Sequence, residues 1–242
     1  MSHLPGRSLS PAWLLDEVGT AGRENLDVDH VARYDDISDS GGGGEVAVLV
    51  ELGLDRYSCP VDLGAGTGQF TLAVAPVCSR VVAVDVSPVM LERLRVKLTA
   101  SALDSVEVVH AGFLTSEHHG QPADFVYFRW ALHHLPDFWK ALALRRMHSI
   151  LRIGGVLRLS DVVYSFDPSD AQERLDQWCA TLPVEAANHD DWVRSDIEEH
   201  VRDEHSTFTW LLESMLERSG FRIEDATYTG DGILAEYVAR AV

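Results

Sequence analysis

The chain has 242 residues, of which 46% are hydrophobic, and it carries a formal net charge of −18 at pH 7. That length suits one domain, which would bury roughly 70% of the surface that the unfolded chain exposes. The negative balance disfavours nucleic acids and anionic membranes as partners, because a field of that sign repels phosphate groups.

The cysteines and the first residues predict a soluble cytoplasmic protein without a zinc site. Cys59, Cys78 and Cys179 are far apart and form no C-x-x-C pair, as is usual in a reducing compartment. The N-terminal stretch MSHLPGRSLSPAW lacks the apolar run of a secretory signal. The other apolar runs are far too short to span a membrane, so we expect no membrane association.

Residues 1–57 are expected to form a helical lid segment before the main domain. Pro11 can open a helix over PAWLLDEV, and EVAVLVELGL predicts a second helix that ends near Gly53. The glycine run at 41–44 predicts a flexible break between the two helices.

From residue 58 onward, strand-like and helix-like segments alternate, which indicates a parallel sheet with helices on both faces. Helices are expected over 88–100 and 136–151, because leucines recur there at helical spacing. The expected strands cover residues 59–63, 80–86, 105–110, 124–128 and 155–163.

The C-terminal part departs from this alternation. Residues 206–219 predict a helix, and the next two strands, FRIEDATY and ILAEYVARA, are joined only by TGDG. So short a connector cannot hold a crossover helix, so the two strands should be antiparallel neighbours. Residues 164–205 form an acidic, tryptophan-bearing helical insertion within the 58–242 domain, and insertions at strand ends often cover a pocket.

The stretch DLGAGTG, residues 62–68, lets a strand turn tightly into a helix while its backbone N–H groups face a ligand above the loop. A dinucleotide-binding loop would have the spacing G-x-G-x-x-G, but Gln69 stands where its third glycine belongs. The loop by itself is therefore ambiguous between nucleotide ligands.

The spacing G-x-G-x-G after an acidic residue resembles motif I of the class I S-adenosylmethionine-dependent methyltransferases. The resemblance continues in the family's order through residues 81–91, 123–137 and 151–161 and includes the C-terminal hairpin. A weaker likeness to small-molecule members lies at VARYDD, residues 31–36. The resemblance implies a doubly wound, Rossmann-like α/β fold with a seven-stranded sheet, mostly parallel, an antiparallel C-terminal strand and a helical N-terminal lid.

The same resemblance implies S-adenosyl-L-methionine as the cofactor and names residues to hold it. Asp62 would help to orient the methionine end, which packs against the glycine loop. Asp85, at the end of the second strand, can accept hydrogen bonds from both ribose hydroxyls. The full set of expected cofactor-binding residues is Asp62, Gly64, Ala65, Gly66, Asp85, Val86, Gly112, Phe113, Arg129 and Tyr34.

The third strand departs from the family pattern. Members commonly carry Gly-Asp there, and the Asp meets the adenine amino group, whereas this chain has Gly112-Phe113. Phe113 either stacks on the adenine or packs in the core. The replacement for the missing carboxylate is not identified from the sequence.

His133 and Asp161 are the candidate catalytic residues, because they follow the fourth and fifth strands where the methyl group should point. His134 matches a histidine shared by members with different acceptors, so a structural or cofactor-side role is favoured for it. Motifs of DNA-methylating enzymes and of magnesium-dependent catechol-type enzymes are absent, since FRWALHH and SDV stand in their places.

The sequence therefore predicts an enzyme that moves a methyl group to the oxygen, nitrogen or carbon of a small-molecule acceptor. Methylation of tRNA or protein, S-adenosylmethionine binding without transfer, and NAD-dependent oxidoreduction are the alternatives. The acidic balance disfavours RNA and says less about protein.

Overall fold

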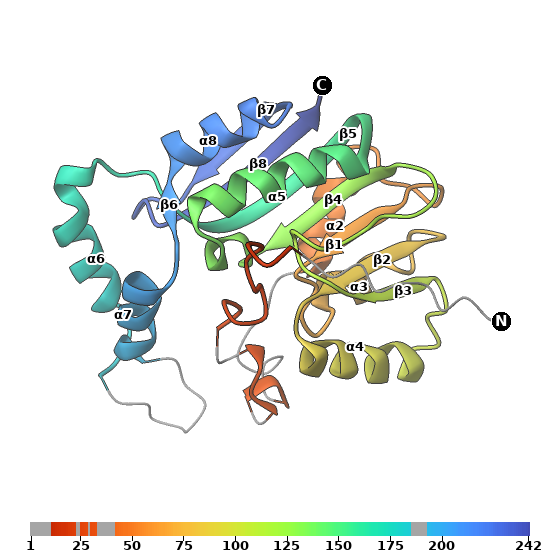
Figure 1. The fold of residues 1–242 in the computed structure, drawn as a ribbon, viewed down its shortest axis with the longest axis horizontal. Helices are drawn as coiled ribbons and strands as arrows, with labels where there is room; N and C mark the ends of the chain where they lie inside the picture. Colours follow the sequence, from red (N-terminus) through yellow and green to blue (C-terminus); the bar gives the residue numbers. More distant parts are fainter. Residues whose placement is uncertain (1–10, 23–24, 29, 33–41, 185–192) are drawn as a thin grey trace.

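The computed structural model describes residues 11–22, 25–28, 30–32, 42–184 and 193–242. One sheet crosses the molecule, and its main path has the order β3-β2-β1-β4-β5-β8-β7 (Figure 1). β1 to β5 are parallel to one another, and β8 is antiparallel to both β5 and β7. The strands are Pro60–Leu63 (β1), Val81–Asp85 (β2), Val106–His110 (β3), Ala123–Arg129 (β4), Leu151–Tyr164 (β5), Phe221–Tyr228 (β7) and Leu234–Ala241 (β8).

This topology confirms the predicted fold class, with seven strands on the main path and the C-terminal hairpin closing the sheet. A further short strand, β6 (Thr207–Phe208), lies off the path and pairs with the end of β5. Because the first five strands are parallel, their carboxyl ends meet at one edge of the sheet, where ligands of such folds bind.

Helices cover both faces of the sheet. α5 (Asp137–Ile150) and α8 (Thr209–Arg218) pack on one face and lie in front of it in Figure 1. The opposite face carries α2 (Gly42–Glu51), α3 (Gln69–Val74) and α4 (Pro88–Ala100). Alternate residues of each strand serve the two faces, as the pleat requires, so Val126 joins one core cluster and Phe125 the other.

Three predicted boundaries were wrong. Gly42 to Gly44 do not form a break but begin α2, and a Cβ on Gly42 would lie 2.7 Å from the carbonyl oxygen of Gln69. The glycine thus permits close packing of α2 on α3.

β5 begins at Leu151 because a bulge around Gly154, with φ +76°, absorbs the extra residues opposite β4. Thr207 and Phe208 are extended, so α8 starts at Thr209.

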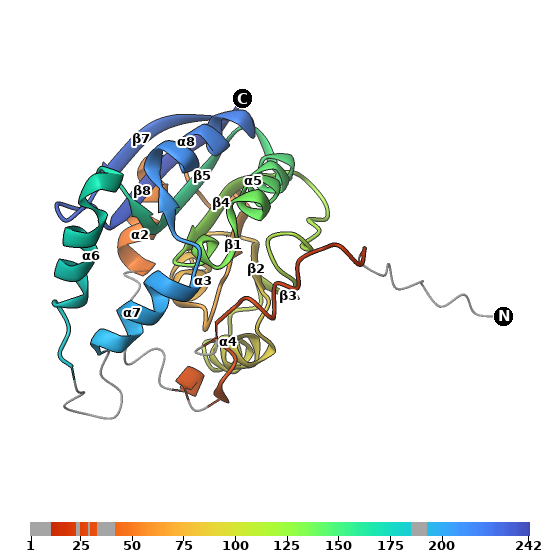
Figure 2. The ribbon, with the colours of Figure 1, turned by 60° about the vertical axis from the view of Figure 1, so that its left-hand side comes forward.

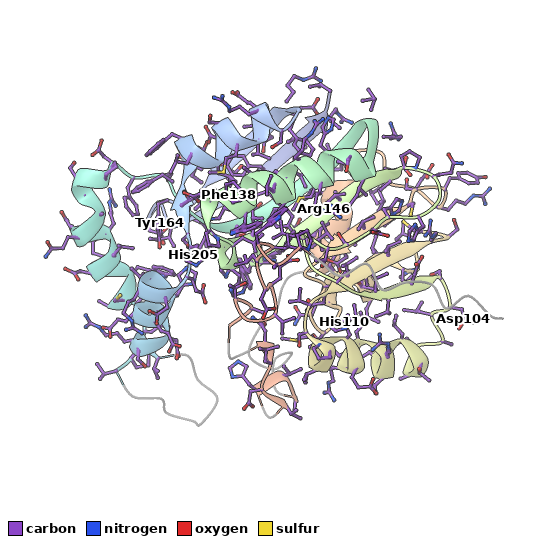
Figure 3. All side chains as sticks on the ribbon, viewed as in Figure 1. Asp104, His110, Phe138, Arg146, Tyr164 and His205 are labelled. Atoms are coloured by element: carbon purple, nitrogen blue, oxygen red, sulfur yellow. The ribbon has the colours of Figure 1, made fainter. Side chains whose placement is uncertain are left out.

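The insertion contains the 3₁₀ turn η3 (Pro168–Asp170) and two helices, α6 (Ala171–Cys179) and α7 (Arg194–Asp203). α6 and α7 pack against each other at one side of the sheet in both ribbon views (Figures 1 and 2). Figure 3 places Tyr164 and His205 between this helix pair and the sheet. The insertion is therefore anchored next to the carboxyl ends of β4 and β5.

Within the described ranges, no helix has both the length and the apolar character needed to cross a bilayer.

Candidate functional site

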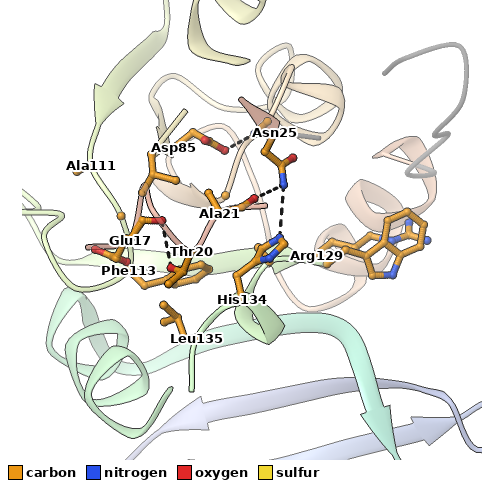
Figure 4. Close-up of a pocket in the computed structure, with 16 residues that line it drawn as sticks. Glu17, Thr20, Ala21, Asn25, Asp85, Ala111, Phe113, Arg129, His134 and Leu135 are labelled. Atoms are coloured by element: carbon orange, nitrogen blue, oxygen red, sulfur yellow. Dashed lines mark hydrogen bonds between the residues drawn. The ribbon is translucent and has the colours of Figure 1, made fainter. Parts of the chain in front are cut away.

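A pocket opens at the carboxyl ends of β1, β2 and β4 and beside the loop that follows β3 (Figure 4). The space between its lining residues is about 630 Å³, a figure that includes open solvent at the mouth. The lining residues are Glu17, Thr20, Ala21, Asn25, Gly64, Gly66, Asp85, Val86, Ala111, Gly112, Phe113, Arg129, Trp130, Ala131, His134 and Leu135.

The glycine loop forms the floor of this pocket. The N–H groups of Gly64 and Ala65 both donate to the carbonyl oxygen of Val84, so the loop is tied to β2 as it leaves β1. Gly64 has φ +73°, and a Cβ there would lie 2.7 Å from the Cβ of Ala131. Glycine is required because the turn adopts a left-handed conformation in close contact with the loop that follows β4.

The Asp85 carboxylate braces the pocket wall. It accepts hydrogen bonds from the N–H of Gly66 at 2.8 Å and from the N–H of Ser87 at 2.7 Å. Burial raises the pKa of this carboxyl, although the two N–H groups act in the opposite direction. Asp85 thus links the glycine loop to the start of α4 while it lines the pocket.

A second carboxylate reaches the pocket from the N-terminal segment, and the sequence did not predict it. Glu17 is 8% exposed, and its carboxylate accepts hydrogen bonds from the Leu114 N–H at 3.1 Å and from the Thr115 hydroxyl at 3.2 Å. Burial raises its pKa. A Cβ on Gly112 would lie 2.3 Å from the Glu17 side chain, so the glycine makes room for it. Glu17 belongs to no motif, so no sequence signal could have indicated it.

The N-terminal segment forms part of the pocket wall. Asn25 donates to the carbonyl oxygen of Ala21 at 2.6 Å and lies 3.5 Å from His134 Nε2 (Figure 4). The Ser87 hydroxyl, at the start of α4, donates to the Asn25 carbonyl oxygen at 2.5 Å. These bonds hold the segment across the edge of the sheet.

Trp130 stands on the pocket wall with φ +49°, a left-handed conformation that a bulky side chain rarely adopts. The Arg129 guanidinium carbon lies 4.1 Å from the centre of a Trp130 ring. Strained residues of this kind concentrate at ligand sites, and here the strain turns the chain sharply after β4.

Most of the expected cofactor residues line this one pocket: Gly64, Gly66, Asp85, Val86, Gly112, Phe113 and Arg129. Asp62 and Ala65 do not line the pocket. The Asp62 carboxylate is buried beneath the loop, where it accepts a hydrogen bond from the Thr71 hydroxyl at 2.5 Å. Phe113 is 8% exposed and also meets Phe128 edge to face, so it packs in the core and lines the pocket at once. Tyr34 lies outside the described residues.

The structure brings the two candidate catalytic residues together. Asp161 Oδ1 lies 2.5 Å from His133 Nδ1, and Asp161 Oδ2 accepts the N–H groups of Leu132 and His133. Neither residue lines the pocket, because the 3₁₀ turn η2 (Leu132–His134) points His133 toward the insertion and His134 toward the pocket. In this geometry the base role predicted for His133 has no support from the pocket.

The two adjacent histidines differ in their electrostatics. Burial and the neighbouring His133 lower the pKa of His134 to about 3, so its ring is neutral. Burial lowers the pKa of His133, but the carboxylates of Asp161 and Glu204 have the larger, opposite effect, so that its pKa is raised overall. His134 Nδ1 is buried and has no hydrogen-bond partner among the described residues.

The pocket has the features that a nucleoside-bearing ligand requires. It offers a buried carboxylate at the end of β2, a glycine floor without side chains and an aromatic wall. These residues fit S-adenosylmethionine, the cofactor implied by the sequence motifs.

Comparisons with known proteins agree with this geometry. Residues 61–155 match the family model described as a methyltransferase domain. No curated protein matches the sequence significantly.

Solved structures share the fold at low sequence identity. An S-adenosylmethionine-dependent methyltransferase from Clostridium acetobutylicum is 17% identical, with a TM-score of 0.64 over 88% of this chain and 95% of that one. One from Aquifex aeolicus is 16% identical, with a TM-score of 0.62 over 90% of this chain and 100% of that one. The mitomycin 7-O-methyltransferase MmcR is 20% identical, with a TM-score of 0.58 over 83% of this chain and 53% of that one.

Proposed function

We propose that this chain, which carries a class I S-adenosylmethionine-dependent methyltransferase domain, moves a methyl group from its cofactor to a small-molecule acceptor. The observation that carries the small-molecule assignment is the wall that the N-terminal segment builds beside the pocket. Glu17, Thr20, Ala21 and Asn25 all line it, so an acceptor must enter a narrow, partly covered space. A base within a folded RNA would not reach this space unless the segment moved away.

Charge supports the same assignment. The chain has a formal net charge of −18, and the pocket itself contains two buried carboxylates, those of Glu17 and Asp85. Both features oppose the approach of a phosphate backbone. A neutral or cationic small molecule meets no such barrier. MmcR, whose fold is similar, is by its name an O-methyltransferase of the small molecule mitomycin.

The proposed cofactor contacts follow from the pocket and from the family resemblance. Asp85 accepts hydrogen bonds from the ribose hydroxyls, and Gly64 and Gly66 allow the methionine end to approach the backbone. Glu17 replaces the carboxylate that the family usually carries after the third strand. Its carboxylate lies beside Gly112 and Phe113, where the resemblance places the adenine, and can accept a hydrogen bond from the adenine amino group.

The bound cofactor supplies a methyl group on a positively charged sulfur. The protein's part is to hold the acceptor in line with that methyl group and to exclude water. His134 is neutral and lines the pocket, so it can accept a hydrogen bond from an acceptor or a cofactor. With so low a pKa it is a poor general base at neutral pH.

The test is transfer from S-adenosylmethionine labelled in its methyl group. Purified protein is incubated with an extract of the source organism separated by size into small molecules, RNA and protein. We expect the label in the small-molecule fraction, and an Asp85→Asn variant should transfer much less of it when the labelled cofactor is limiting. Label in the RNA or protein fraction would contradict the proposed acceptor class while leaving the methyltransferase assignment intact.

A further inference from the structure

Three side chains from distant parts of the chain converge next to the pocket. His133 lies in the turn after β4, whereas His200 lies in the last turn of α7 and Glu204 directly follows that helix in the insertion. One nitrogen of each histidine and one carboxylate oxygen of Glu204 all lie within 4.8 Å of one another. The side chains are 8%, 14% and 22% exposed for His133, His200 and Glu204, so the cluster is largely shielded from water.

The Glu204 carboxylate pairs with both histidines, but one of its oxygens is poorly placed for hydrogen bonding. Glu204 Oε2 is buried and has no hydrogen-bond partner of ordinary geometry among the described residues. Even so, His133 Nε2 lies 3.2 Å from it, and His200 Nδ1 is closer still. A buried carboxylate oxygen that faces two ring nitrogens without hydrogen bonds of good geometry needs a different partner.

The other nitrogen of each ring is already occupied. His133 Nδ1 lies 2.5 Å from Asp161 Oδ1, and His200 Nε2 lies 2.9 Å from the Ser206 hydroxyl. When His133 donates Nδ1–H to Asp161, its Nε2 presents a lone pair toward Glu204. Metal-binding histidines are oriented in this way, by a carboxylate or another polar group on the nitrogen that does not bind the metal.

We propose that His133 Nε2, His200 Nδ1 and one Glu204 carboxylate oxygen bind a single divalent transition-metal ion of the zinc class, with Asp161 and Ser206 orienting the two rings. Two imidazoles and one carboxylate form a donor set that suits Zn²⁺ or Co²⁺ better than Mg²⁺ or Ca²⁺, which prefer oxygen ligands. In a tetrahedral zinc site, ligand atoms are roughly 3.3–3.5 Å apart. The His133–Glu204 separation of 3.2 Å is close to that value, whereas His200 Nδ1 and Glu204 Oε2 lie closer together than two ligands of one ion and would move apart on metal binding.

The charges of the cluster agree with a dication. Asp161 and Glu204 bring two negative charges to a mostly buried region, and a histidine that binds a metal ion through one nitrogen does so in its neutral form. A divalent ion would balance both carboxylates.

The site would join α7 to the turn that lines the pocket. His133 and His134 have ring centres 4.4 Å apart, and His134 forms part of the pocket wall. A metal ion on His133 would therefore fix the turn η2 and hold the insertion against the carboxyl ends of β4 and β5. This role is structural and does not depend on the identity of the methyl acceptor.

The proposal departs from the expectation that the chain binds no metal. That expectation rested on cysteine spacing and on the magnesium positions of catechol-type enzymes. The signal that could have suggested the site is the spacing of His200 and Glu204, four residues apart on one helix face. The third ligand follows only from the fold.

The experiment measures metal binding directly. Protein freed of metal by a chelator and dialysis is titrated calorimetrically with ZnCl₂, and its unfolding temperature is measured with and without the ion. We expect one Zn²⁺ per chain, a higher unfolding temperature with Zn²⁺ and no change with MgCl₂. Co²⁺ should give the visible absorption of a four- or five-coordinate site.

The matched variants are His200→Gln and Glu204→Gln, with His119→Gln as the control on an exposed histidine. The first two should lose the Zn²⁺ binding and the Co²⁺ absorption, and the control should keep both. Circular dichroism establishes that each variant is folded. No Zn²⁺ uptake by the wild type, or uptake that survives in both cluster variants, would overturn the proposal. His133 would then be an imidazolium between two carboxylates.

Discussion

Asp85 and Glu17 both place a carboxylate in the pocket, but they reach it from different parts of the chain. Asp85 ends β2, so its position follows from the strand pattern and from the family motif. Glu17 comes from the N-terminal segment and reaches the loop after β3 through long-range contacts. Single substitutions can separate their roles.

Asp85→Asn should weaken the binding of S-adenosylhomocysteine between about 10-fold and 100-fold. Loss of a charged hydrogen bond costs about 1.5–3 kcal/mol. Isothermal titration measures the change, and Asp124→Asn is the control because that carboxylate lies at the opposite end of the sheet, where it accepts the Cys59 N–H. Equal losses in the two variants would indicate a general effect of removing charge.

Glu17→Gln should reduce the affinity for S-adenosylhomocysteine by about 10-fold, since an amide accepts a hydrogen bond from the adenine amino group less well than a carboxylate. Gly112→Ala should have a similar effect, because its methyl group displaces the Glu17 side chain. The double variant should lose no more than the larger single loss. Additive losses would show that the two residues act independently.

Asp62→Asn should stabilise the protein above neutral pH. Burial raises the pKa of Asp62 to about 7, so the folded state binds a proton that the unfolded state releases between about pH 4 and 7. The wild type therefore loses stability as the pH rises through that window. The variant does not titrate there, and its advantage in unfolding free energy should grow from near zero at pH 4 to at most about 4 kcal/mol above pH 7.

Urea unfolding across this pH range measures the difference between the two proteins. A constant difference from pH 4 to pH 8 would mean that Asp62 keeps an ordinary pKa in the folded state.

At the scale of elements, α2 is attached to the sheet by charge as well as by packing. Arg158 on β5 is 5% exposed and pairs through its guanidinium with Glu45 on α2 at 2.9 Å and with Glu236 on β8. Leu49 of the same helix is fully buried. The helix expected within a lid segment therefore packs as part of the layer that covers the sheet.

Glu45→Ala should lower the free energy of unfolding by about 3 kcal/mol, because it leaves a buried guanidinium with only a half-exposed partner. The double variant Glu45→Leu, Arg158→Met should recover most of that loss, since an apolar pair needs no charge compensation. Urea denaturation at pH 7 measures both. A loss below about 0.5 kcal/mol in the single variant would show that the pair is solvated in solution.

At the scale of the whole molecule, S-adenosylhomocysteine should stabilise the fold against unfolding and NADH should not, which distinguishes the two classes of cofactor. S-adenosylhomocysteine at a hundred times its dissociation constant adds about 2.7 kcal/mol, which for a chain of this size raises the unfolding temperature by about 5–10 °C. NADH should cause no shift. Stabilisation by NADH alone would contradict the cofactor assignment.

The alternation of strands and helices, the C-terminal hairpin, the glycine loop and the place of Asp85 at the end of a strand were predictable from the sequence. Side chains along a strand point alternately to the two faces of the sheet, so a strand leaves a pattern with a period of two in the sequence. A tight turn from a strand into a helix requires glycine, so it also leaves a local pattern. These patterns and the short TGDG connector predicted a parallel sheet closed by a hairpin, and the resemblance to the methyltransferase family supplied the rest of the confirmed fold class.

Tertiary structure alone decided the rest of the site. Glu17 lies 97 residues from Leu114, and His133 lies 71 residues from Glu204, so no local pattern relates either pair. A long-range contact also explains the start of α2, because Gly42 packs closely against the backbone of Gln69 and Phe70 in α3. Local sequence determined where each strand ends and which loop carries glycine. Long-range packing decided which side chains meet at those ends, because contacts between distant segments depend on how the whole chain folds.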